Sequence, residues 1–326
     1  MMKKINLGIV GVTGLVGNVL LKVLEEYEIP IDVLKVFASS KSVGKRVNFN
    51  SKEYLVEPLK EGCFSSLDLV LFTCGKDVSK IWVEEALKNK IKVIDNSSFF
   101  RLRDDVCLLI PEVNLSSYDN HLLISNPNCS TIQSLVAIKP IEDLFKINKI
   151  IYSTYQSVSG GGKKLLDELN DVLSGKDNNV LPYNISKSLI PEIDSYDNNE
   201  YSKEETKMIL ETKKILKRDD LLCVATCVRV PIVRSHAVSI YLECEKEISI
   251  DLLMEKYKKM NNVVILNDLK NHLYPVGEKA IGNDSVYIGR IRKVKDNPQA
   301  LLLYVVSDNL RKGAASNMVE IIKKIM

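Results

Sequence analysis

The sequence has no long hydrophobic run and only three histidines. No stretch approaches the roughly 20 consecutive apolar residues of a membrane-spanning helix, so we expect no membrane partner. Lys3-Lys4 and the apolar stretch after them imitate a secretory signal. Glycines interrupt that stretch and no small-residue cleavage site follows it, which favours a cytoplasmic location.

The charged residues are almost balanced, with 45 Lys and Arg against 42 Asp and Glu. The lysines are scattered, and no basic run is interleaved with aromatic residues. This pattern argues against nucleic-acid binding. Internal repeats and low-complexity tracts are absent from the sequence as well.

The cysteine pattern fits reduced thiols better than a disulfide framework. There are seven cysteines, an odd number, and most lie in apolar, strand-like runs, which is typical of reduced thiols. Cys223 and Cys227 have the spacing of a metal-binding pair, but no second pair or nearby histidine completes a site. We therefore expect buried thiols and no metal.

The first third of the chain alternates strands and helices. Apolar runs predict strands at 5–10, 34–38, 69–73, 92–94 and 122–125, and helical spacing predicts helices at 16–27 and 79–89. Continuous apolar strands separated by helices are typical of a parallel sheet covered on both faces. The prediction is an α/β fold with a Rossmann-type doubly wound sheet over residues 1–128.

The rest of the chain has longer strands. They are expected at 149–157, 223–230, 237–243, 286–293 and 301–307, with long excursions between them. This predicts a second α+β domain with a mixed sheet at 129–308, carrying catalytic groups and a dimer contact. Segment 170–201 is expected to be an extended surface loop, and 309–326 an amphipathic helix that rejoins the first domain.

A glycine-rich turn, Gly11-Val12-Thr13-Gly14-Leu15-Val16-Gly17, leads from the first strand into the first helix. Glycines there permit a tight turn and close approach of a pyrophosphate to the helix N-terminus. The motif predicts a dinucleotide site, with Gly11, Thr13, Gly14, Leu15 and Val16 as contacts.

The residues at the end of the second strand help to distinguish an NAD site from an NADP site. NAD sites usually place an acid there, whereas this chain has Ala38-Ser39-Ser40-Lys41-Ser42. Hydroxyls and a cation suit a 2′-phosphate, which favours NADP, with Lys41 and Ser42 as contacts. A polar loop without that role is the alternative.

A single cysteine lies where a strand gives way to a helix, in Ser125-Asn126-Pro127-Asn128-Cys129-Ser130-Thr131-Ile132-Gln133. Pro127 ends the strand, and the apolar run after it has helical spacing. Cys129 is therefore expected among unpaired amides at the positive end of a helix dipole, which favours a thiolate. It is a candidate nucleophile.

Three other segments carry candidate site residues. Arg229 ends one strong strand and His236 opens the next, which favours an anion site, although a lone histidine is often structural. Three consecutive glycines follow the strand that ends near Gln156, in YQSVSGGGK, and predict a close approach to a phosphate or nicotinamide. Arg101 follows a strand of the first domain, where open α/β sheets collect ligand groups.

Ser202-Lys203-Glu204-Glu205-Thr206-Lys207 predicts a helix start. Ser202 and Glu205 form a capping box. Glu204 and Lys207 lie one turn apart, and from the residues alone they are read as a solvated ion pair.

These segments resemble aspartate-semialdehyde dehydrogenases nearly end to end. The matching motifs occur in the family's order: GVTGLVG, SNPNCSTIQ, YQSVSGGGK, SKEETKM, CVRVP followed by His236, and VVSDNLRKGAA. The resemblance implies NADPH-dependent reductive dephosphorylation of 4-phospho-L-aspartate to L-aspartate 4-semialdehyde, through a cysteine thioester. It implies a role in the biosynthesis of lysine and diaminopimelate, threonine and methionine, and a homodimer.

The resemblance also assigns roles to single residues. It implies that Cys129 is the nucleophile, that His236 is the acid/base, and that Asn128 and the helix amides hold the oxyanion. The remaining implied roles are α-carboxylate binding by Arg229, α-ammonium binding by Glu204, phosphate binding by Arg101 and Lys207, substrate positioning by Gln156, and nicotinamide contacts from Ser159, Gly160, Gly161, Gly162 and Asn309.

The sequence departs from the family pattern at two places. Lys41 stands where relatives often have arginine, and a lysine binds phosphate as a point charge without the arginine fork. Ala237-Val238 follow His236, where relatives often have Ser-Glu. If that glutamate orients the histidine in relatives, His236 here depends on another group.

Three alternative functions would require different residues from those found in this sequence. N-acetyl-γ-glutamyl-phosphate reductase acts on an acylated substrate and needs no partner for a free ammonium, which the pair of Glu204 and Arg229 would supply. A glyceraldehyde-phosphate dehydrogenase would show Cys-Thr-Thr-Asn instead of Cys-Ser-Thr-Ile. A silent NADP-binding sensor would lack Cys129 or His236, and both are present.

Overall fold

The computed structural model describes residues 3–326, and the chain divides into two units. Unit 1 comprises the chain up to Pro127 together with Ala314–Met326, and unit 2 comprises Asn128–Gly313. The chain therefore passes from one unit to the other just before Cys129 and returns just after Gly313. The sequence predicts these domain boundaries at 128/129 and 308/309.

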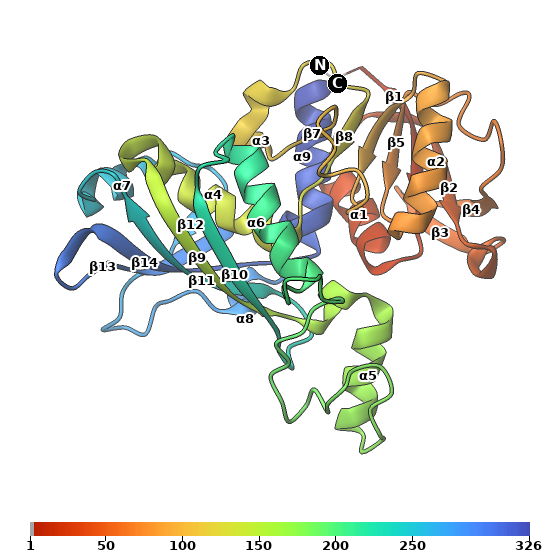
Figure 1. The fold of residues 1–326 in the computed structure, drawn as a ribbon. Helices are drawn as coiled ribbons and strands as arrows, with labels where there is room; N and C mark the ends of the chain where they lie inside the picture. Colours follow the sequence, from red (N-terminus) through yellow and green to blue (C-terminus); the bar gives the residue numbers. More distant parts are fainter. Residues whose placement is uncertain (1–2) are drawn as a thin grey trace. The chain divides into compact units, whose positions relative to one another are not determined.

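Unit 1 contains an eight-stranded sheet in the order β3-β4-β2-β1-β5-β6-β8-β7 (Figure 1). All neighbouring strands are parallel except β3 and β4. This confirms the doubly wound parallel sheet. The strands are β1 Ile5–Val10, β2 Ile31–Ala38, β3 Arg46–Phe49, β4 Lys52–Pro58, β5 Leu69–Phe72, β6 Lys92–Asp95, β7 Cys107–Leu108 and β8 Leu123–Ser125.

Helices cover both faces of this sheet because its strands are apolar on both sides. Leu7 and Ile9 of β1 face α1 (Leu15–Glu26) and α9 (Ser316–Ile325), whereas Val10 faces α2 (Lys76–Lys88). Each face thus has its own core, as the period of two along a strand requires. The short elements are η1 (Ser40–Ser42), α3 (Pro111–Asn114) and η2 (Leu115–Ser117).

Unit 2 contains a six-stranded mixed sheet in the order β10-β9-β11-β14-β13-β12. The pairs β9–β10 and β12–β13 are parallel and the other pairs are antiparallel. This confirms the predicted second domain. The strands are β9 Ile147–Gln156, β10 Leu222–Arg229, β11 His236–Cys244, β12 Val263–Ile265, β13 Val286–Val294 and β14 Asn297–Ser307.

One face of the second sheet is covered by helices. The helix α4 (Cys129–Phe145) contacts β11 and β14, and α6 (Lys203–Leu216) contacts β10. The helix α7 (Ile250–Tyr257) packs on α4, where the Tyr257 hydroxyl donates to the Ala137 carbonyl. Residues of β9 alternate between buried and partly or fully exposed, so the other face is open within this unit.

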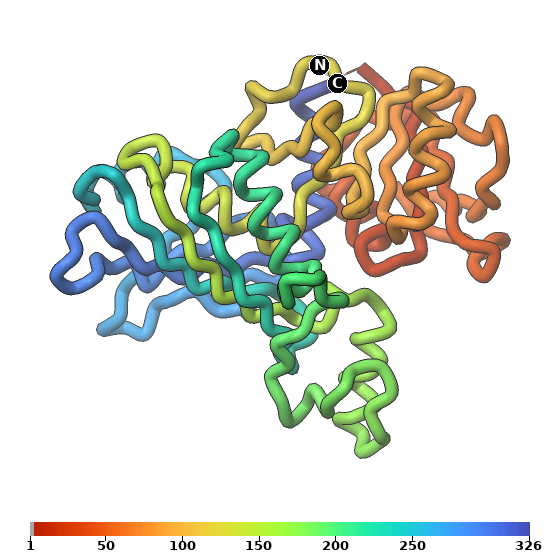
Figure 2. The backbone as a smooth tube through the Cα atoms, viewed as in Figure 1, coloured from red at the N-terminus to blue at the C-terminus, as the bar shows by residue number. Residues whose placement is uncertain are grey.

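An excursion between β9 and α6 leaves the end of the sheet (Figures 1 and 2). It contains η3 (Val158–Gly161) and α5 (Lys163–Leu173), and the chain after α5 is mostly irregular. The expectation of a plain surface loop at 170–201 is wrong in part, because Ile185 and Ile190 pack with Val158, Leu169 and Val172 in a small core. Later short elements are α8 (Gly277–Ala280) and η4 (Arg311–Ala315).

Candidate active site

Three predicted site residues lie in one row across the second sheet. The register pairs Arg229 of β10 with Gln156 of β9, and Gln156 with His236 of β11. All three side chains are buried. Paired residues on neighbouring strands share a face of the sheet. The structure therefore brings together Arg229, Gln156 and His236, which are far apart in the sequence.

Cys129 is the first residue of α4, as predicted, and it is half-buried. Asn128 is the N-cap, and its Oδ1 accepts from the backbone amides of Ser130 and Thr131 at 2.9 and 3.1 Å. The prediction that the first amides of this helix are unpaired is wrong for these two, because the cap satisfies them. Neither amide is left to hold an oxyanion.

Two buried carboxylates of α6 hold Asn128. Oε1 of Glu204 accepts from Nδ2 of Asn128 at 2.7 Å, and Oε2 of Glu211 accepts from its backbone amide at 2.6 Å. Glu204 and Glu211 are two turns apart and so share one face of α6. Glu211 is a buried neighbour of the site that was not among the residues predicted from the sequence. Its spacing from Glu204 was the available signal.

Glu204 is not the solvated ion pair that the residues alone suggested. It is 6% exposed, and its Oε2 lies 3.2 Å from Nζ of Lys207. Burial by itself raises the pKa of this carboxyl, but Lys207, the Asn128 amide and Arg229 together lower it to about 2. Lys207 also contacts Asp194 at 3.4 Å. The predicted capping box of Ser202 and Glu205 is confirmed.

Gln133 joins the cysteine helix to the histidine strand. It lies one turn after Cys129, is fully buried, and donates from Nε2 to the backbone carbonyls of His236 and Val305 at 3.3 and 3.4 Å. Its Oε1 accepts from the Ser307 hydroxyl at 2.6 Å. These bonds fix the first turn of α4 over the row of site residues. No local pattern separates Gln133 from other polar residues of a helix.

The glycine loop after β9 lies against Arg229 and His236. A Cβ atom on Gly160 would lie 2.9 Å from Nε2 of His236 and 3.0 Å from Nη1 of Arg229. Nη1 of Arg229 also donates to the Ser157 carbonyl at 2.7 Å. Glycine at this position therefore keeps open the space beside both side chains. Gly161 and Gly162 follow in the same loop, and Gly162 has a φ of 78°.

Asn309 ties the glycine loop to the turn before β11. Its Nδ2 donates to the Ser159 hydroxyl at 3.0 Å, and its Oδ1 accepts from the Ser235 amide at 2.8 Å. Asn309 and Ser159 are both buried. The two side chains are thus bonded to each other.

Gly313 packs directly on the candidate nucleophile. A Cβ atom on Gly313 would lie 2.7 Å from Cβ of Cys129. Only a residue without a side chain fits there while Cys129 keeps its place. Gly313 lies in η4, a π-helical turn, and such turns are frequent at functional sites.

Unit 1 has a cavity of about 740 Å³ above the carboxyl ends of its central strands. The turn after β1 contributes Gly11, Thr13 and Gly14, and the segment after β2 contributes Ser39 and Ser40. Gly11 has a φ of 87°, and a side chain there would collide with the Thr73 backbone at 2.9 Å. This is where open α/β sheets bind nucleotides. No aspartate or glutamate of the described chain lines the cavity.

Four predicted cofactor contacts do not line this cavity. Leu15 and Val16 start α1, and Lys41 is exposed beside Ser40. The Ser42 hydroxyl lies 3.3 Å from that of Thr13, so Ser42 braces the glycine turn.

Arg101 belongs to unit 1 and Lys207 to unit 2, so the two predicted phosphate ligands come from different units. Arg101 is buried, and its Nη2 donates to the Asn96 carbonyl at 2.8 Å. The same loop is anchored by the buried Asp95, whose carboxylate accepts from the hydroxyls of Ser79 and Ser97. Burial raises the pKa of Asp95.

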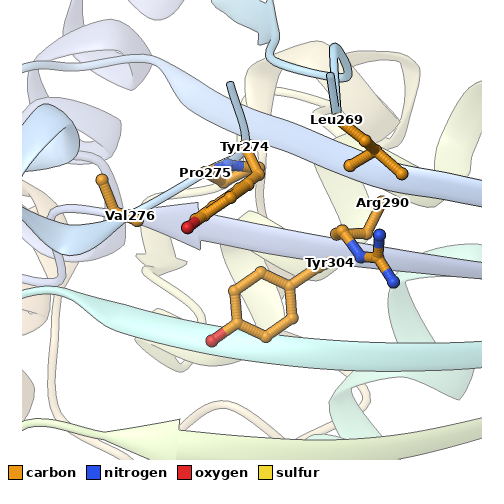
Figure 3. Close-up of a pocket in the computed structure, with 6 residues that line it drawn as sticks. All are labelled: Leu269, Tyr274, Pro275, Val276, Arg290 and Tyr304. Atoms are coloured by element: carbon orange, nitrogen blue, oxygen red, sulfur yellow. The ribbon is translucent and has the colours of Figure 1, made fainter. Parts of the chain in front are cut away.

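A second cavity of about 490 Å³ lies in unit 2, away from the row of site residues. Figure 3 shows it lined by Tyr274 and Pro275 from the segment before α8 and by Tyr304 of β14. Leu269, Val276 and Arg290 complete the lining. Tyr304 stacks at a tilt near Tyr155, with ring centroids 6.4 Å apart, so the cavity adjoins the open face of the sheet.

Residues 3–326 contain neither a cluster of metal-binding side chains nor a membrane-spanning helix. No group of histidine, cysteine, aspartate and glutamate side chains in this range could hold a metal ion. No helix in the same range combines the length and apolar character needed to cross a bilayer.

Two family models match the two units. The model described as semialdehyde dehydrogenase, NAD binding domain, matches residues 6–121, and the model described as semialdehyde dehydrogenase, dimerisation domain, matches residues 138–312. The aspartate-semialdehyde dehydrogenase of Aquifex aeolicus is 43% identical over 324 residues, covering 96% of this chain and 95% of that protein. The chain belongs to the aspartate-semialdehyde dehydrogenase family.

Other aspartate-semialdehyde dehydrogenases agree in sequence and in fold. The enzyme of Legionella pneumophila is 43% identical over 331 residues, covering 98% of this chain and 95% of that protein. The crystal structure of aspartate semialdehyde dehydrogenase II of Vibrio cholerae, complexed with ASA, is 38% identical with a TM-score of 0.94, covering 99% of this chain and 98% of that chain. Membership of this family makes the chain an oxidoreductase of amino-acid biosynthesis.

Proposed function

We propose that this chain catalyses the reversible, NADPH-dependent reductive dephosphorylation of 4-phospho-L-aspartate to L-aspartate 4-semialdehyde, through a thioester on Cys129. The observation that carries the proposal is the arrangement around α4. Cys129 begins this helix, Glu204 holds its N-cap, and Gln133 fixes its first turn to the row that contains His236 and Arg229.

The residues of unit 1 fit NADP. The cavity beside Gly11 has no carboxylate to repel a 2′-phosphate, and Ser39 and Ser40 offer hydroxyls. We propose that Lys41 and Ser42 complete the phosphate contacts and that Ser159–Gly162 with Asn309 contact the nicotinamide. The bound nicotinamide supplies the hydride.

Substrate recognition is assigned to two buried charges. Arg229 offers a planar guanidinium suited to the α-carboxylate. Glu204 is ionised at neutral pH, because its neighbours lower its pKa to about 2, and it pairs with the α-ammonium. Gln156, between Arg229 and His236 in the row, positions the reacting end. A substrate without a free ammonium, such as an N-acetylated one, leaves Glu204 without that partner.

The chemical step is assigned to Cys129. Its thiolate attacks the acyl phosphate carbon and expels phosphate, which Arg101 and Lys207 hold. Asn128 keeps Cys129 at the start of α4, and its amide has a second N–H besides the one given to Glu204. We propose that His236 is the acid/base for the proton transfers around the sulfur and the oxygen. The product would serve the biosynthesis of lysine and diaminopimelate, threonine and methionine.

The reverse reaction gives the direct test. Purified protein should reduce NADP⁺ when L-aspartate 4-semialdehyde and inorganic phosphate are both present, and omission of phosphate should stop turnover because the thioester has no acceptor. Formation of NADPH is followed by absorbance. An arm with NAD⁺ should show a lower kcat/KM. Turnover of N-acetylglutamate semialdehyde without turnover of the aspartate compound would overturn the proposal.

We also propose that two copies of the chain associate through the open face of the second sheet. Ile151 and Tyr155 of β9 and Leu222 of β10 are each more than a third exposed within one chain. Neighbouring apolar side chains on an open sheet mark an interaction surface. A second copy fits because the same patch on both chains forms a closed, two-fold interface.

Sedimentation should therefore give twice the chain mass of 36.7 kDa. Tyr155→Lys should shift the particle toward the single-chain mass, since it places a charge in the apolar contact. Leu173→Lys is the matched control, because Leu173 is exposed on α5 and lies outside this face. A single-chain mass for the unaltered protein contradicts the dimer.

A further inference from the structure

A buried carboxylate lies at the carboxyl end of β6. Asp95 is the last residue of this strand and is fully buried. Its Oδ1 accepts from the Ser79 hydroxyl at 2.9 Å and from the Ser97 backbone amide at 3.1 Å, and its Oδ2 accepts from the Ser97 hydroxyl at 2.6 Å. Ser79 belongs to α2, whereas Ser97 lies in the loop 96–101, which ends at Arg101. Asp95 therefore holds this loop from below.

The Ser97 hydroxyl carries the order of Asp95 further into the loop. Because its proton points to the carboxylate, a lone pair of Oγ is left to accept from the Phe99 backbone amide, at 3.3 Å. The next side chain, Phe100, is fully buried in the core on the side of α2. The chain is therefore fixed at Phe99 and at Phe100, directly before Arg101.

The guanidinium of Arg101 is bonded back to the first residue of the loop. Its Nη2 donates to the Asn96 carbonyl at 2.8 Å. The side chain of Asn96 is fixed in turn, because its Oδ1 accepts from Nδ2 of Asn126 at 2.8 Å. Oδ1 of Asn126 accepts from Nδ2 of Asn317 on α9 at 2.7 Å. The loop is thus held at its start and before its end, and the arginine head group is tied to the fixed start.

Electrostatics alone do not account for a carboxylate at this place. Burial raises the pKa of Asp95, and the hydrogen bonds from Ser97 and Ser79 and the charge of Arg101 oppose that rise. All three hydrogen-bond partners of the carboxylate are donors, which favours the ionised form. A negative charge near a site for an anion weakens the binding of that anion. The benefit of Asp95 therefore lies in the bonds it accepts, which order the loop.

We propose that Asp95 is a positioning residue for the phosphate site, which acts through Ser97 to hold the loop 96–101 and with it the guanidinium of Arg101. The inference rests on the proposed function, in which Arg101 binds phosphate. An arginine that is already ordered loses less side-chain entropy when it binds an anion. Loosening the loop should therefore weaken phosphate binding and leave the other substrates almost unaffected.

Two serines on the same carboxylate give a matched pair of variants. Each of Ser97→Ala and Ser79→Ala removes one hydroxyl from Asp95, but only Ser97 belongs to the loop. Ser97→Ala should raise KM for phosphate in NADP⁺ reduction about 10-fold, the factor of one hydrogen bond to a charged group. Ser79→Ala should change it less than about twofold. Equal changes in the two variants contradict the proposal, and thermal unfolding shows whether both lose similar stability.

The other two KM values show whether the effect is confined to phosphate. In Ser97→Ala, KM for NADP⁺ and for L-aspartate 4-semialdehyde should change less than about twofold. The lining of the nucleotide cavity includes neither Ser97 nor Asp95. A general loosening of the protein would raise all three values together, and that result contradicts a role specific to the phosphate site.

Two further variants test the route through Arg101. In an Arg101→Gln background, Ser97→Ala should add less than about twofold to KM for phosphate, because the group that it positions is gone. A full second loss in the double variant contradicts the proposal. Asp95→Asn should raise KM for phosphate at least as much as Ser97→Ala. Removal of a negative charge by itself would lower that KM, so a fall in Asp95→Asn also overturns the positioning role.

Inorganic phosphate is the probe in a measurement that needs no turnover. With NADP⁺ present and the semialdehyde absent, the phosphorus NMR signal of phosphate should broaden as protein is added. The dissociation constant obtained in this way should be about 10-fold higher for Ser97→Ala than for the unaltered protein. Equal constants overturn the proposal. Since this result does not depend on the reaction, its failure is distinguishable from failure of the proposed function.

Discussion

Replacing Cys129 by alanine is expected to lower kcat for phosphate-dependent NADP⁺ reduction on the order of 10⁴-fold or more, since the proposed acyl intermediate forms on the sulfur of this residue. Asn128 and Gln133 hold the start of α4 through bonds that do not involve the sulfur. The variant should therefore keep its fold, and steady-state kinetics measure the loss directly.

Binding of NADPH should change little in the same variant. The nucleotide cavity lies in unit 1, and Cys129 belongs to unit 2. Fluorescence titration with NADPH therefore distinguishes a chemical defect from a folding defect. Cys63→Ala is a matched control, because Cys63 is a buried thiol of the core that packs under α2. Cys63→Ala should keep both activity and NADPH binding, whereas retention of activity in Cys129→Ala would rule out Cys129 as the nucleophile.

The helix starts and the glycine turn of this site could be predicted from the sequence, because each depends on residues that are close together in the chain. Pro127 and the apolar spacing after Cys129 locate the strand end and the helix start within a few residues. The capping box at Ser202 and Glu205 depends only on residues of one helical turn. The glycine turn after β1 is similar, since its chemistry follows from a strand, a turn and a helix in sequence.

The row of Arg229, Gln156 and His236 could not be predicted from residues alone. It depends on the register of β10, β9 and β11, which is set by non-local pairing and by which faces become buried. The family resemblance supplied the roles of these residues, and the register explains their proximity.

Other strands and site residues were not predicted from the sequence, and the physical reason differs from one to the next. The strands β3 and β4 form an edge hairpin with many exposed polar residues, and β7 has only two residues, so none has a clear apolar run. Glu211 and Gln133 are polar residues of helices, and only tertiary packing shows that they are buried. Gly313 is required by its approach to Cys129, which no local pattern reports.

Glu204→Gln has the second large expected effect, and it acts on stability as well as on activity. The buried carboxylate is balanced by Lys207 and Arg229, so its loss leaves buried positive charge uncompensated. Its pKa falls from 4.5 to about 2 on folding, and this shift corresponds to about 3 kcal/mol of unfolding free energy at neutral pH. Denaturant unfolding measures the difference.

The pH dependence of this difference follows from the direction of the shift. Because the pKa of Glu204 is lower in the folded state, its contribution is present above pH 4.5 and is lost as the pH falls toward 2. The unfolding free energies of the two proteins should therefore converge over that range. Glu200→Gln is the matched control, since Glu200 is exposed and its replacement should leave the curve unchanged. A gap that persists at the acid end would mean that the carboxylate charge is not its source.

The catalytic effect of Glu204→Gln separates two roles of the carboxylate. Glu204 would bind the substrate ammonium, and it also holds Asn128 beside Cys129. With L-aspartate 4-semialdehyde we expect kcat/KM to fall about 10²-fold, the cost of leaving a buried charge without its partner. With 4-oxobutanoate, which lacks only the amino group, the fall should be much smaller, because that substrate makes no use of the carboxylate. Equal falls with both substrates would place the effect at Asn128 and Cys129 and would remove Glu204 as the ammonium site.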